Sequence, residues 1–302
     1  MGEGNMKDKK IGVLMGGKSS EREISLKSGK AILQSLIHSG YNAVGIDAEN
    51  NLVESLKKQK VQVVFIALHG KWGEDGTAQG LLEMMGIPYT GSGVLGSAIS
   101  IDKVIMKMLL DSIGLPTPAY AVCQAGDKVK FPMPFVVKPA NEGSTIGISI
   151  VRNIKEKDEA IKNGLKYDKK VLIEKYIQGE EITVGIANNE VLPVIKVKPL
   201  KGFYDFEAKY TKGMTEYIIP AKISKKVEKK AQDYALIVYK TFELSGCARI
   251  DMMVEGDIPL IIDINTSPGM TETSLVPKAW EYLGKSFDSL VEEILKEASL
   301  KT

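Results

Sequence analysis

Two contrasting patterns along the chain constrain its fold more than any other feature of the sequence. In the first third, short apolar runs alternate with helical segments: the runs occupy residues 10–17, 42–47 and 61–68, and the helical segments 23–40 and 76–86. This alternation predicts a parallel sheet covered by helices on both faces. Ligands of such sheets bind beyond the carboxyl ends of the strands, which makes 15–25 and 68–76 candidate binding segments.

The pattern changes after a helical stretch at 91–114, where "LPTP" marks a boundary near residue 115. Beyond it, the polar loop "NEGSTI" (141–146) separates two apolar runs and predicts a hairpin with a long tip. Further strands follow with short turns between them, which is typical of antiparallel sheets. The predicted fold class is therefore an N-terminal parallel-sheet α/β domain followed by an antiparallel α+β part.

Composition narrows the classes of function. A chain of 302 residues is long enough for two or three domains, and a net charge of +2 gives no support for a nucleic-acid or membrane partner. No apolar run approaches the length of a membrane span, and no signal peptide precedes the first strand, so we expect a cytoplasmic protein. Cys123 and Cys247 lie far apart and are expected to be buried thiols rather than a disulfide framework.

Two stretches match nucleotide-binding patterns without the context that those patterns need. "GVLMGGKS" (12–19) fits the phosphate-loop pattern, yet most of its residues continue an apolar strand and could not form a cradle of backbone amides. "GSGVLG" (91–96) fits G-x-G-x-x-G but does not follow the first strand of a βαβ unit, so we interpret it as a turn before a helix. Ser19 or Ser20 followed by Glu23 resembles a helix capping box.

The clearest chemical signal lies in two apolar runs near the C-terminus. "ARIDMMV" and "LIIDIN" flank the turn "EGDIP", which predicts an antiparallel hairpin. A tip centred near Asp257 places Asp251 opposite Asp263, and period-two alternation puts Asn265 and Arg249 on the same face. Opposed carboxylates repel unless a cation lies between them, and such oxygen ligands suit Mg²⁺ that shares its shell with phosphates. The alternative is a solvent-facing polar strand edge.

Other segments have the residue types of a phosphate-binding site. Lys138 ends the run "FVVKPA", and the next loop carries small residues at Gly143, Ser144 and Gly147 that let the backbone approach phosphate. A solvated lysine and an ordinary hairpin tip are the alternatives. The paired acids of "IQGEEITV" could hold a ribose or face water, and "GFYDFEAKYTKG" is a long loop around Lys209, of the kind that often forms a lid.

Together these stretches resemble the D-alanine–D-alanine ligases of the ATP-grasp superfamily, and the similarity covers almost the whole chain. It is carried by "VLMGGKSSEREISLKSG", "FIALHGKWGEDGTAQGLLEMMGIPYTGSG", "DK" at 102–103, "VVKPANEGSTIGI", "IEKYIQGEEITV", "FYDFEAKY", "RIDMM" and "NTSPGMTETSLVP". The resemblance implies a two-part ATP-grasp fold after the N-terminal domain. It also implies ATP-dependent, ADP-forming synthesis of D-alanyl-D-alanine through a D-alanyl phosphate, for peptidoglycan precursors, by a homodimer with a possible monovalent cation.

The resemblance further implies a site for ATP and for two Mg²⁺ or Mn²⁺ ions. The residues expected to bind ATP are Lys103, Lys138 and Lys209 at the phosphates, Glu181 at the ribose, and Glu174, Lys175, Tyr176, Ile177, Phe203 and Met253 around the adenine. Asp251, Asp263 and Asn265 would hold the metal. The family's motif has Glu where this chain has Asp263, and because the shorter Asp reaches fewer ions, the number of ions stays open.

The two D-alanine molecules are expected at a second group of residues. Implied by the resemblance are Glu21 at the ammonium of the first D-alanine with His69 nearby, Arg249 and the amide of Gly269 at the oxyanion, and Ser274 with the amide of Leu275 at the carboxylate of the second. Ser144 and Tyr210 would form a hydrogen-bonded link with Glu21. Relatives that make the D-alanine–D-lactate ester often carry Phe in place of Tyr210, so this residue favours the dipeptide.

The expected domains are an N-terminal substrate-binding domain at 1–100, a central ATP-grasp domain at 101–184 and a C-terminal ATP-grasp domain with the metal site at 185–302. Three other functions stay open. The chain could make D-alanyl-D-serine or the D-lactate ester, which residues 271–275 would decide. It could be a catalytically silent nucleotide-binding module, against which the intact acids and lysines argue, or a phosphate-loop NTPase that uses Lys18.

Overall fold

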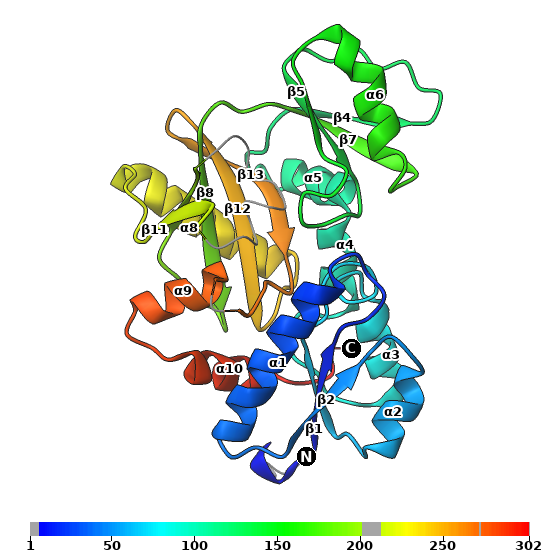
Figure 1. Cartoon of the computed structure of the whole chain (residues 1–302). Coiled ribbons are helices and arrows are strands. Elements are labelled where there is room, and N and C mark those ends of the chain that lie inside the picture. The colour runs from blue at the N-terminus through cyan, green and yellow to red at the C-terminus, as the bar shows by residue number, and fades with distance from the viewer. Residues whose placement is uncertain (1–5, 201–212, 272, 302) are drawn as a thin grey trace.

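The computed structural model describes residues 6–200, 213–271 and 273–301. Its strands form three sheets, and Figure 1 shows them one after another, with the N-terminal sheet at the bottom and the sheet of β4, β5 and β7 at the top. The larger sheet, which contains β8, β12 and β13, lies between them. This mixed architecture confirms the predicted fold class.

The N-terminal sheet is parallel, with the strand order β2-β1-β3. Its strands are β1 (Ile11–Met15), β2 (Ala43–Asp47) and β3 (Val63–Ile66), and a short 3₁₀ helix (Met6–Asp8) precedes them. The accompanying helices are α1 (Arg22–His38), α2 (Leu52–Lys58) and α3 (Thr77–Met85). The helix α2 was not predicted, because seven residues are too few to display a clear helical period.

The helical stretch predicted at 91–114 is two helices, α4 (Val94–Ile101) and α5 (Lys103–Ser112). The break lies at Asp102, whose extended backbone ends α4 and whose carboxylate accepts the amides of Val104 and Ile105 at 3.1 and 3.3 Å. This is an N-cap for α5. The same carboxylate pairs with Lys170 at 2.6 Å, so a contact distant in sequence fixes the break.

The central sheet is antiparallel, with the order β4-β7-β5-β6. Its strands are β4 (Tyr120–Gln124), β5 (Phe135–Pro139), β6 (Ser149–Val151) and β7 (Lys170–Lys175), and its helix is α6 (Ile154–Gly164). Strands β5 and β6 pair directly, with Val137 opposite Ser149, which confirms the hairpin predicted around 141–146.

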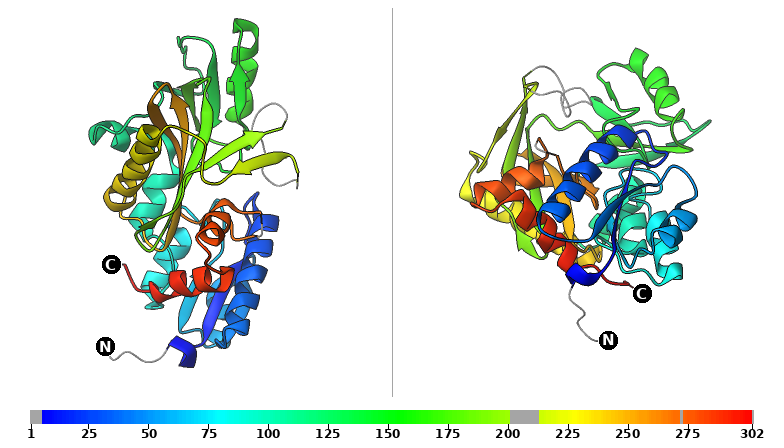
Figure 2. Two further views of the ribbon diagram at one scale, coloured as in Figure 1. Left: turned by 90° about the vertical axis from the view of Figure 1, so that its left-hand side faces the viewer. Right: turned by 60° about the horizontal axis from the view of Figure 1, so that its bottom comes forward.

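The larger sheet has six strands and carries the second predicted hairpin. Its strands are β8 (Glu180–Ala187), β9 (Glu190–Val191), β10 (Ile195–Pro199), β11 (Thr215–Ile218), β12 (Cys247–Glu255) and β13 (Ile258–Asn265). Strands β12 and β13 place Asp251 opposite Asp263 and Arg249 opposite Asn265, so the predicted register is confirmed. Figure 2 shows α8 (Lys225–Thr241) on one side of this sheet and α9 (Leu275–Tyr282) on the other.

The hydrophobic cores cross the sequence divisions. One core joins Val13 and Phe65 of the N-terminal sheet to Trp280 of α9 and Leu290 of α10 (Phe287–Lys296), so the C-terminal helices bind the first sheet to the larger one. A second core joins Met106 of α5 to α8 and the larger sheet. The central sheet has a core of its own around Phe135.

The structure also bears on the predictions about the cysteines and about membrane-spanning helices. Cys123 and Cys247 are both buried and both free, as the sequence indicates. Within the described ranges, no helix is both long and apolar enough to cross a membrane.

The packing of α1 on β1 gives a test of this arrangement. Gly29 lies so close to β1 that an added Cβ would stand 2.4 Å from the Cβ of Met15. Helix propensity alone predicts that Gly29→Ala stabilises the protein by about 1 kcal/mol. We expect instead a loss of about 1–3 kcal/mol, because Met15 Cβ cannot move away without its strand.

The matched control is Gly80→Ala in α3, where the nearest atom to the new Cβ is 3.9 Å away. This substitution should raise stability by up to about 1 kcal/mol. Urea unfolding followed by circular dichroism measures both variants. A gain in both would show that α1 does not pack on β1 as described.

Candidate active site

Two adjoining cavities lie where the three sheets meet. The large cavity, of about 450 Å³, lies between the central sheet and the larger sheet. The small cavity, of about 80 Å³, lies between the N-terminal loops, the end of the β12–β13 hairpin and the start of α9. Both are lined by Gly143, Ser144 and Asp263, so ligands in the two cavities would meet at these residues.

The described site residues predicted from the sequence each line one of these cavities. The large cavity is lined by Lys103, Lys138, Ser144, Glu174, Lys175, Tyr176, Ile177, Glu181, Asp251, Met253 and Asp263. The small cavity is lined by Glu21, His69, Ser144, Arg249, Asp263, Asn265, Gly269, Ser274 and Leu275. The predicted residues Phe203, Lys209 and Tyr210 lie outside the described residues.

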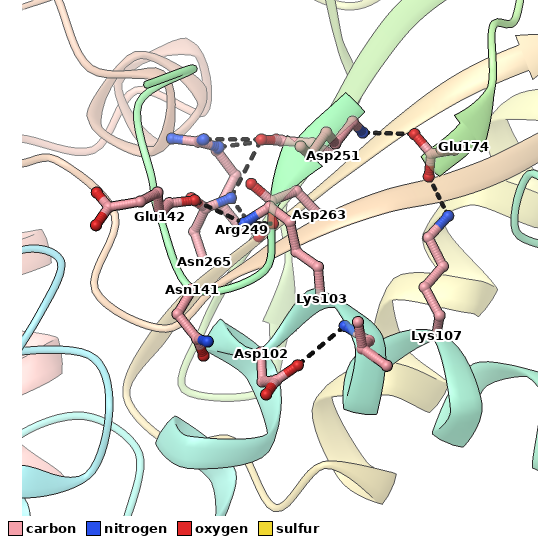
Figure 3. Close-up of polar contacts among 12 residues, drawn as sticks. Asp102, Lys103, Lys107, Asn141, Glu142, Glu174, Arg249, Asp251, Asp263 and Asn265 are labelled. Atoms are coloured by element: carbon pink, nitrogen blue, oxygen red, sulfur yellow. Dashed lines mark hydrogen bonds and ion pairs between the residues drawn. The ribbon is translucent and has the colours of Figure 1, made fainter. Parts of the chain in front are cut away.

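The β12–β13 hairpin carries the charged centre of the site (Figure 3). Arg249 donates to both carboxylate oxygens of Asp251, each at 2.8 Å. Asn265 Nδ2 donates to Asp251 Oδ2 at 3.1 Å, and the buried hydroxyl of Thr183 donates to Oδ1 at 2.6 Å. The facing carboxylate of Asp263 has Lys103 Nζ at 3.4 Å. The repulsion expected between the opposed carboxylates is therefore offset by cations of the protein itself.

The donors on this face also fit a divalent cation. Side-chain oxygens of three predicted metal residues lie where the cavities adjoin: Asp263 lines both cavities, Asp251 the large one and Asn265 the small one. Among the residues that the structure describes, no group of three or more His, Cys, Asp or Glu side chains could hold a metal by itself. Two carboxylates and an amide match Mg²⁺, which binds few protein groups and takes its other ligands from phosphates and water.

Lys103 owes its position to the break between α4 and α5. As the first residue of α5 it donates its amide to Ala140 O at 2.9 Å, which ties the helix start to the end of β5. Its Nζ donates to Glu142 O at 2.9 Å and lies near Asp263. A continuous helix from 94 to 112 would turn this ammonium to another direction.

A buried cluster of two lysines and one glutamate closes the floor of the large cavity. Glu174 on β7 accepts from Lys138 Nζ at 2.5 Å with one oxygen and from Lys107 Nζ with the other (Figure 3 shows Lys107 reaching it from α5). Burial of Glu174 disfavours its charge, but Lys107 and Lys138 outweigh burial and hold its pKa below the usual range. Glu174 is therefore an ionised carboxylate, and Lys107 is a contributor that sequence analysis did not single out.

In the small cavity, Glu21 connects the N-terminal domain to the central one. It is the N-cap residue of α1, only 7% exposed, and its carboxylate accepts from the hydroxyl of Ser144. A Cβ at Gly143 would stand 2.8 Å from Glu21 Oε2, so a side chain there would displace the carboxylate from its present position. The predicted pairing of Ser144 with Glu21 is thus present.

His69 is buried beside this carboxylate. Its Nε2 lies 3.2 Å from Ser28 Oγ, which accepts the amide of Met270 at 3.1 Å. Burial lowers the pKa of His69, and the neighbouring Glu21 only partly opposes this, so the imidazole is neutral near pH 7. The ring therefore acts as a polar, uncharged wall of the small cavity.

The far wall of the small cavity is the N-terminus of α9. Ser274 precedes the helix, and its Oγ accepts the amide of Thr271 at 2.9 Å. A Cβ on Gly269 would lie 2.9 Å from the same oxygen, so the backbone of Gly269 passes close to it. The first amides of a helix favour an anion, which matches the predicted carboxylate site at Ser274 and Leu275.

Sequence reasoning missed Glu74, although it lies within the stretch "HGKWGEDG". Its carboxyl lines the small cavity and accepts the amides of Gly70 at 2.6 Å and Ser267 at 3.2 Å. Burial, with the charge of Glu21 adding to it, raises the pKa of Glu74 to about 8. Glu74 therefore joins the N-terminal domain to the loop after β13 as a largely protonated group.

Lys196 and Lys198 were also missed, and both line the large cavity from β10. Lys196 pairs with Glu180, and Lys198 pairs with Glu216 at 3.0 Å. Their signal was the alternation in "VIKVKP", which places both side chains on one face of a strand.

The structure also shows what the two stretches with nucleotide-binding patterns form. Residues 12–15 of the phosphate-loop match are buried strand, and 91–96 forms a turn that begins α4 at Val94, as we interpreted both. The capping-box interpretation is wrong, because α1 begins at Arg22 without a side-chain cap. Ser19 Oγ instead donates to His69 O at 2.7 Å, which fixes the wall of the small cavity.

The fold and the two joined cavities define a ligase of the ATP-grasp class, in which a nucleotide and a small substrate meet between two antiparallel sheets. Residues 48–92 match the family model described as "D-ala D-ala ligase N-terminus", and residues 109–296 match "D-ala D-ala ligase C-terminus". The chain belongs to the D-alanine–D-alanine ligase family, and it is an ATP-dependent ligase.

Individual relatives agree with this family. The chain is 50% identical to the D-alanine–D-alanine ligase of Syntrophotalea carbinolica, over 98% of each chain. It is 46% identical to that of Carboxydothermus hydrogenoformans, over 95% of this chain and 97% of the relative. The crystal structure of the Bacillus anthracis enzyme complexed with ATP is similar, with a TM-score of 0.84 at 34% identity, covering 96% of this chain and 97% of that one.

The raised pKa of Glu74 predicts a dependence of stability on pH. The folded protein keeps Glu74 protonated up to about pH 8, whereas the unfolded chain ionises it from about pH 4.5. Between these values unfolding releases a proton, so the contribution of Glu74 to stability is full below pH 4.5 and falls as pH rises to 8. Glu74→Gln removes this loss.

We expect Glu74→Gln to gain stability relative to the wild type between pH 5 and pH 8. The carboxyl faces the small cavity and is partly exposed, so the expected relative gain is only about 1–2 kcal/mol. Melting temperatures of both proteins at pH 5, 6.5 and 8 measure it. A constant difference over this range would contradict the protonated state of Glu74.

Proposed function

We propose that the chain joins two D-alanine molecules into D-alanyl-D-alanine, with ATP bound in the large cavity and the amino acids in the small one. This assignment rests on the junction of the two cavities at Ser144 and Asp263. Buried lysines lie on its large-cavity side, and groups suited to bind the carboxylate and the ammonium of an amino acid lie on its small-cavity side. A triphosphate and a carboxylate would come together there. The dipeptide serves peptidoglycan precursor synthesis, as in the family.

In the first step, the carboxylate of one D-alanine attacks the terminal phosphate of ATP, ADP leaves, and an acyl phosphate forms. Both reactants are negative, so the main catalytic contribution comes from the cations where they meet, which offset the repulsion between them. Lys103 and Lys138 are buried at 5% and 7% exposure, where their charges are screened little by water. We assign both to the phosphates, together with Lys209, and we assign Glu21 to the ammonium of the first D-alanine.

The remaining nucleotide contacts follow the lining of the large cavity. We assign Glu181 to the ribose, and Glu174, Lys175, Tyr176, Ile177, Phe203 and Met253 to the adenine side. Asp251, Asp263 and Asn265 would hold Mg²⁺ or Mn²⁺, which when bound neutralises charge on the phosphates. The number of ions stays open, because Asp263 is shorter than the Glu of the family's motif and reaches fewer ions.

In the second step, the amine of the other D-alanine, having lost a proton, attacks the acyl carbon, and inorganic phosphate leaves as the amide bond forms. We assign the carboxylate of this acceptor to Ser274 and the amide of Leu275 at the N-terminus of α9. Arg249 and the amide of Gly269 line the same cavity and are assigned to the oxyanion that develops on the acyl carbon. The hydrogen bond of Ser144 to Glu21, completed by Tyr210, would hold the loop over the reactants. Tyr210 favours the amine acceptor over D-lactate.

The wider setting belongs to the same proposal. We place the chain in the cytoplasm, where ATP is available, and we keep three domains with the first division near residue 100. The second division, expected at 184, falls inside β8 (Glu180–Ala187), so we move it to the turn 176–179.

We also propose a homodimer. Three successive helices that contact one another, α3, α4 and α5, expose large apolar side chains to solvent. These are Met84, Val94, Leu95, Ile105 and Met108. Exposed apolar side chains gathered on neighbouring elements favour an association surface.

Phosphate release from ATP and Mg²⁺ tests the reaction. We expect release with D-alanine and none with L-alanine, and the mass of the dipeptide as the only product when D-alanine and D-lactate are both supplied. Binding of ATP without D-alanine-dependent release would favour a silent relative. Ester as the main product would favour the D-lactate alternative and shift attention to residues 271–275.

The same assay separates the two candidate phosphate lysines. Lys138→Ala should lower kcat/KM for ATP by a factor on the order of 10² or more, because it removes a buried cation from the reacting phosphates. Lys18→Ala is the matched control and should change this value by less than about threefold, since Lys18 lies over the ring of Trp72 and outside both cavities. Full turnover in Lys138→Ala would refute the assignment of the large cavity.

Sedimentation velocity tests the homodimer. The wild type should sediment at twice its chain mass of 33.0 kDa. Leu95→Glu on α4 should give a monomer, because a carboxylate cannot be buried at an apolar interface without a large cost. Ile154→Glu, at a similarly exposed apolar residue on α6, is the control and should stay dimeric. A monomeric wild type would rule the interface out.

A further inference from the structure

Lys107 is a fully buried charged residue that the chemistry above leaves without a role. It is the fifth residue of α5, its exposure is 0%, and it does not line the large cavity. It therefore cannot touch a nucleotide bound there. Placing an ammonium in such a position costs stability unless its surroundings compensate it, so its contacts indicate what it does.

The contacts hold the Lys107 ammonium against the back of the nucleotide site. Its Nζ donates to Glu174 Oε1 and, at 2.5 Å, to Thr117 Oγ1, whose own proton goes to Ile261 O at 2.7 Å. It also lies 5.7 Å from the ring centre of Tyr120. Thr117 and Ile261 fix the position of Lys107 from the side of the larger sheet, and the Lys107 ammonium forms an ion pair with Glu174.

Glu174 in turn contacts a lysine that faces the cavity. Its second oxygen accepts from Lys138 Nζ at 2.5 Å, and both Glu174 and Lys138 line the large cavity. With Lys107 present, two positive charges and one negative charge leave this buried cluster positive. Without it, Lys138 and Glu174 would form a neutral pair, and Glu174 would offset the charge that Lys138 presents to the phosphates.

We propose that Lys107 is a positioning residue for ATP binding: it neutralises Glu174 from behind, and so leaves the charge of Lys138 available to the phosphates. This inference rests on the proposed function, because it takes the large cavity as the ATP site. Glu174 then has two roles: it lies on the adenine side of the cavity, and its carboxylate orients the ammonium groups of Lys107 and Lys138.

The protonation of Lys107 adds a property that can be measured. Burial lowers the pKa of Lys107 to about 8; Glu174 and Asp111 oppose this effect, and Lys138 adds to it. The positive charge is therefore present below about pH 8 and lost above it. ATP affinity should fall as pH rises through this value, by up to about tenfold.

Equilibrium binding of ATP with Mg²⁺, measured by calorimetry on the full chain, tests the proposal. Lys107→Met keeps the shape of the side chain and removes the charge, and we expect the Kd for ATP to rise about 10- to 100-fold at pH 7. The KM for D-alanine should change by less than about twofold. In a Glu174→Gln background, Lys107→Met should cost less than about threefold, because no carboxylate remains to be neutralised.

The outcomes are distinguishable from those of the proposed function. A wild type that does not bind ATP would overturn the function itself. Binding by the wild type, with equal losses in both backgrounds or no loss in Lys107→Met, would overturn only the role of Lys107. The Kd of Glu74→Gln between pH 6.5 and 9, a variant that removes the other group with a pKa near 8, decides the case if Lys107→Met does not fold. An affinity that is constant through pH 8 contradicts the proposal.

Discussion

The pairing of β12 with its two neighbours is the constraint on which the rest of the site depends. On one side it sets Asp251 opposite Asp263, and on the other it sets Asp251 opposite Thr183 and Met253 opposite Glu181. Because side chains alternate between the faces of a sheet, a slip of one residue would move all of these groups to the opposite face. One register therefore places the residues assigned to the metal and the acid assigned to the ribose together.

That register brings several charged side chains close together, and the described part of the site stabilises them by pairing each carboxylate with a cation. Arg249 holds Asp251, Lys103 lies near Asp263, and Lys138 and Lys107 share Glu174. A buried charge without a partner costs several kcal/mol, so these pairs let the protein keep the cations assigned to its substrates in place before any substrate arrives. Each carboxylate that holds a cation is also a group assigned to metal or nucleotide, so the same side chains serve the free and the bound state.

Much of this could be predicted from local sequence, and what could not be predicted depends on distant partners. The parallel strands and both hairpins follow from apolar periodicity and turn residues, because these signals lie within each segment. The break at Asp102 was missed since an apolar period runs through it and Lys170, which fixes it, is far along the chain. Likewise Glu74 reads as a surface acid until Ser267, 193 residues away, is seen to donate to it.

The distribution of cores indicates which part of the molecule holds the reactants rigidly. The N-terminal sheet shares one core with α9 and α10, so Glu21 and Ser274 belong to one packed body. The central sheet has a core of its own, shares a small apolar cluster with Val104 of α5, and meets this body at the small cavity through polar contacts such as Ser144 to Glu21. Because separating polar contacts exposes less apolar surface than splitting a shared core, entry of ATP is less costly by movement of the central sheet. The walls that Glu21 and Ser274 give the small cavity then stay in place, while the wall formed by Gly143 and Ser144 moves with the central sheet.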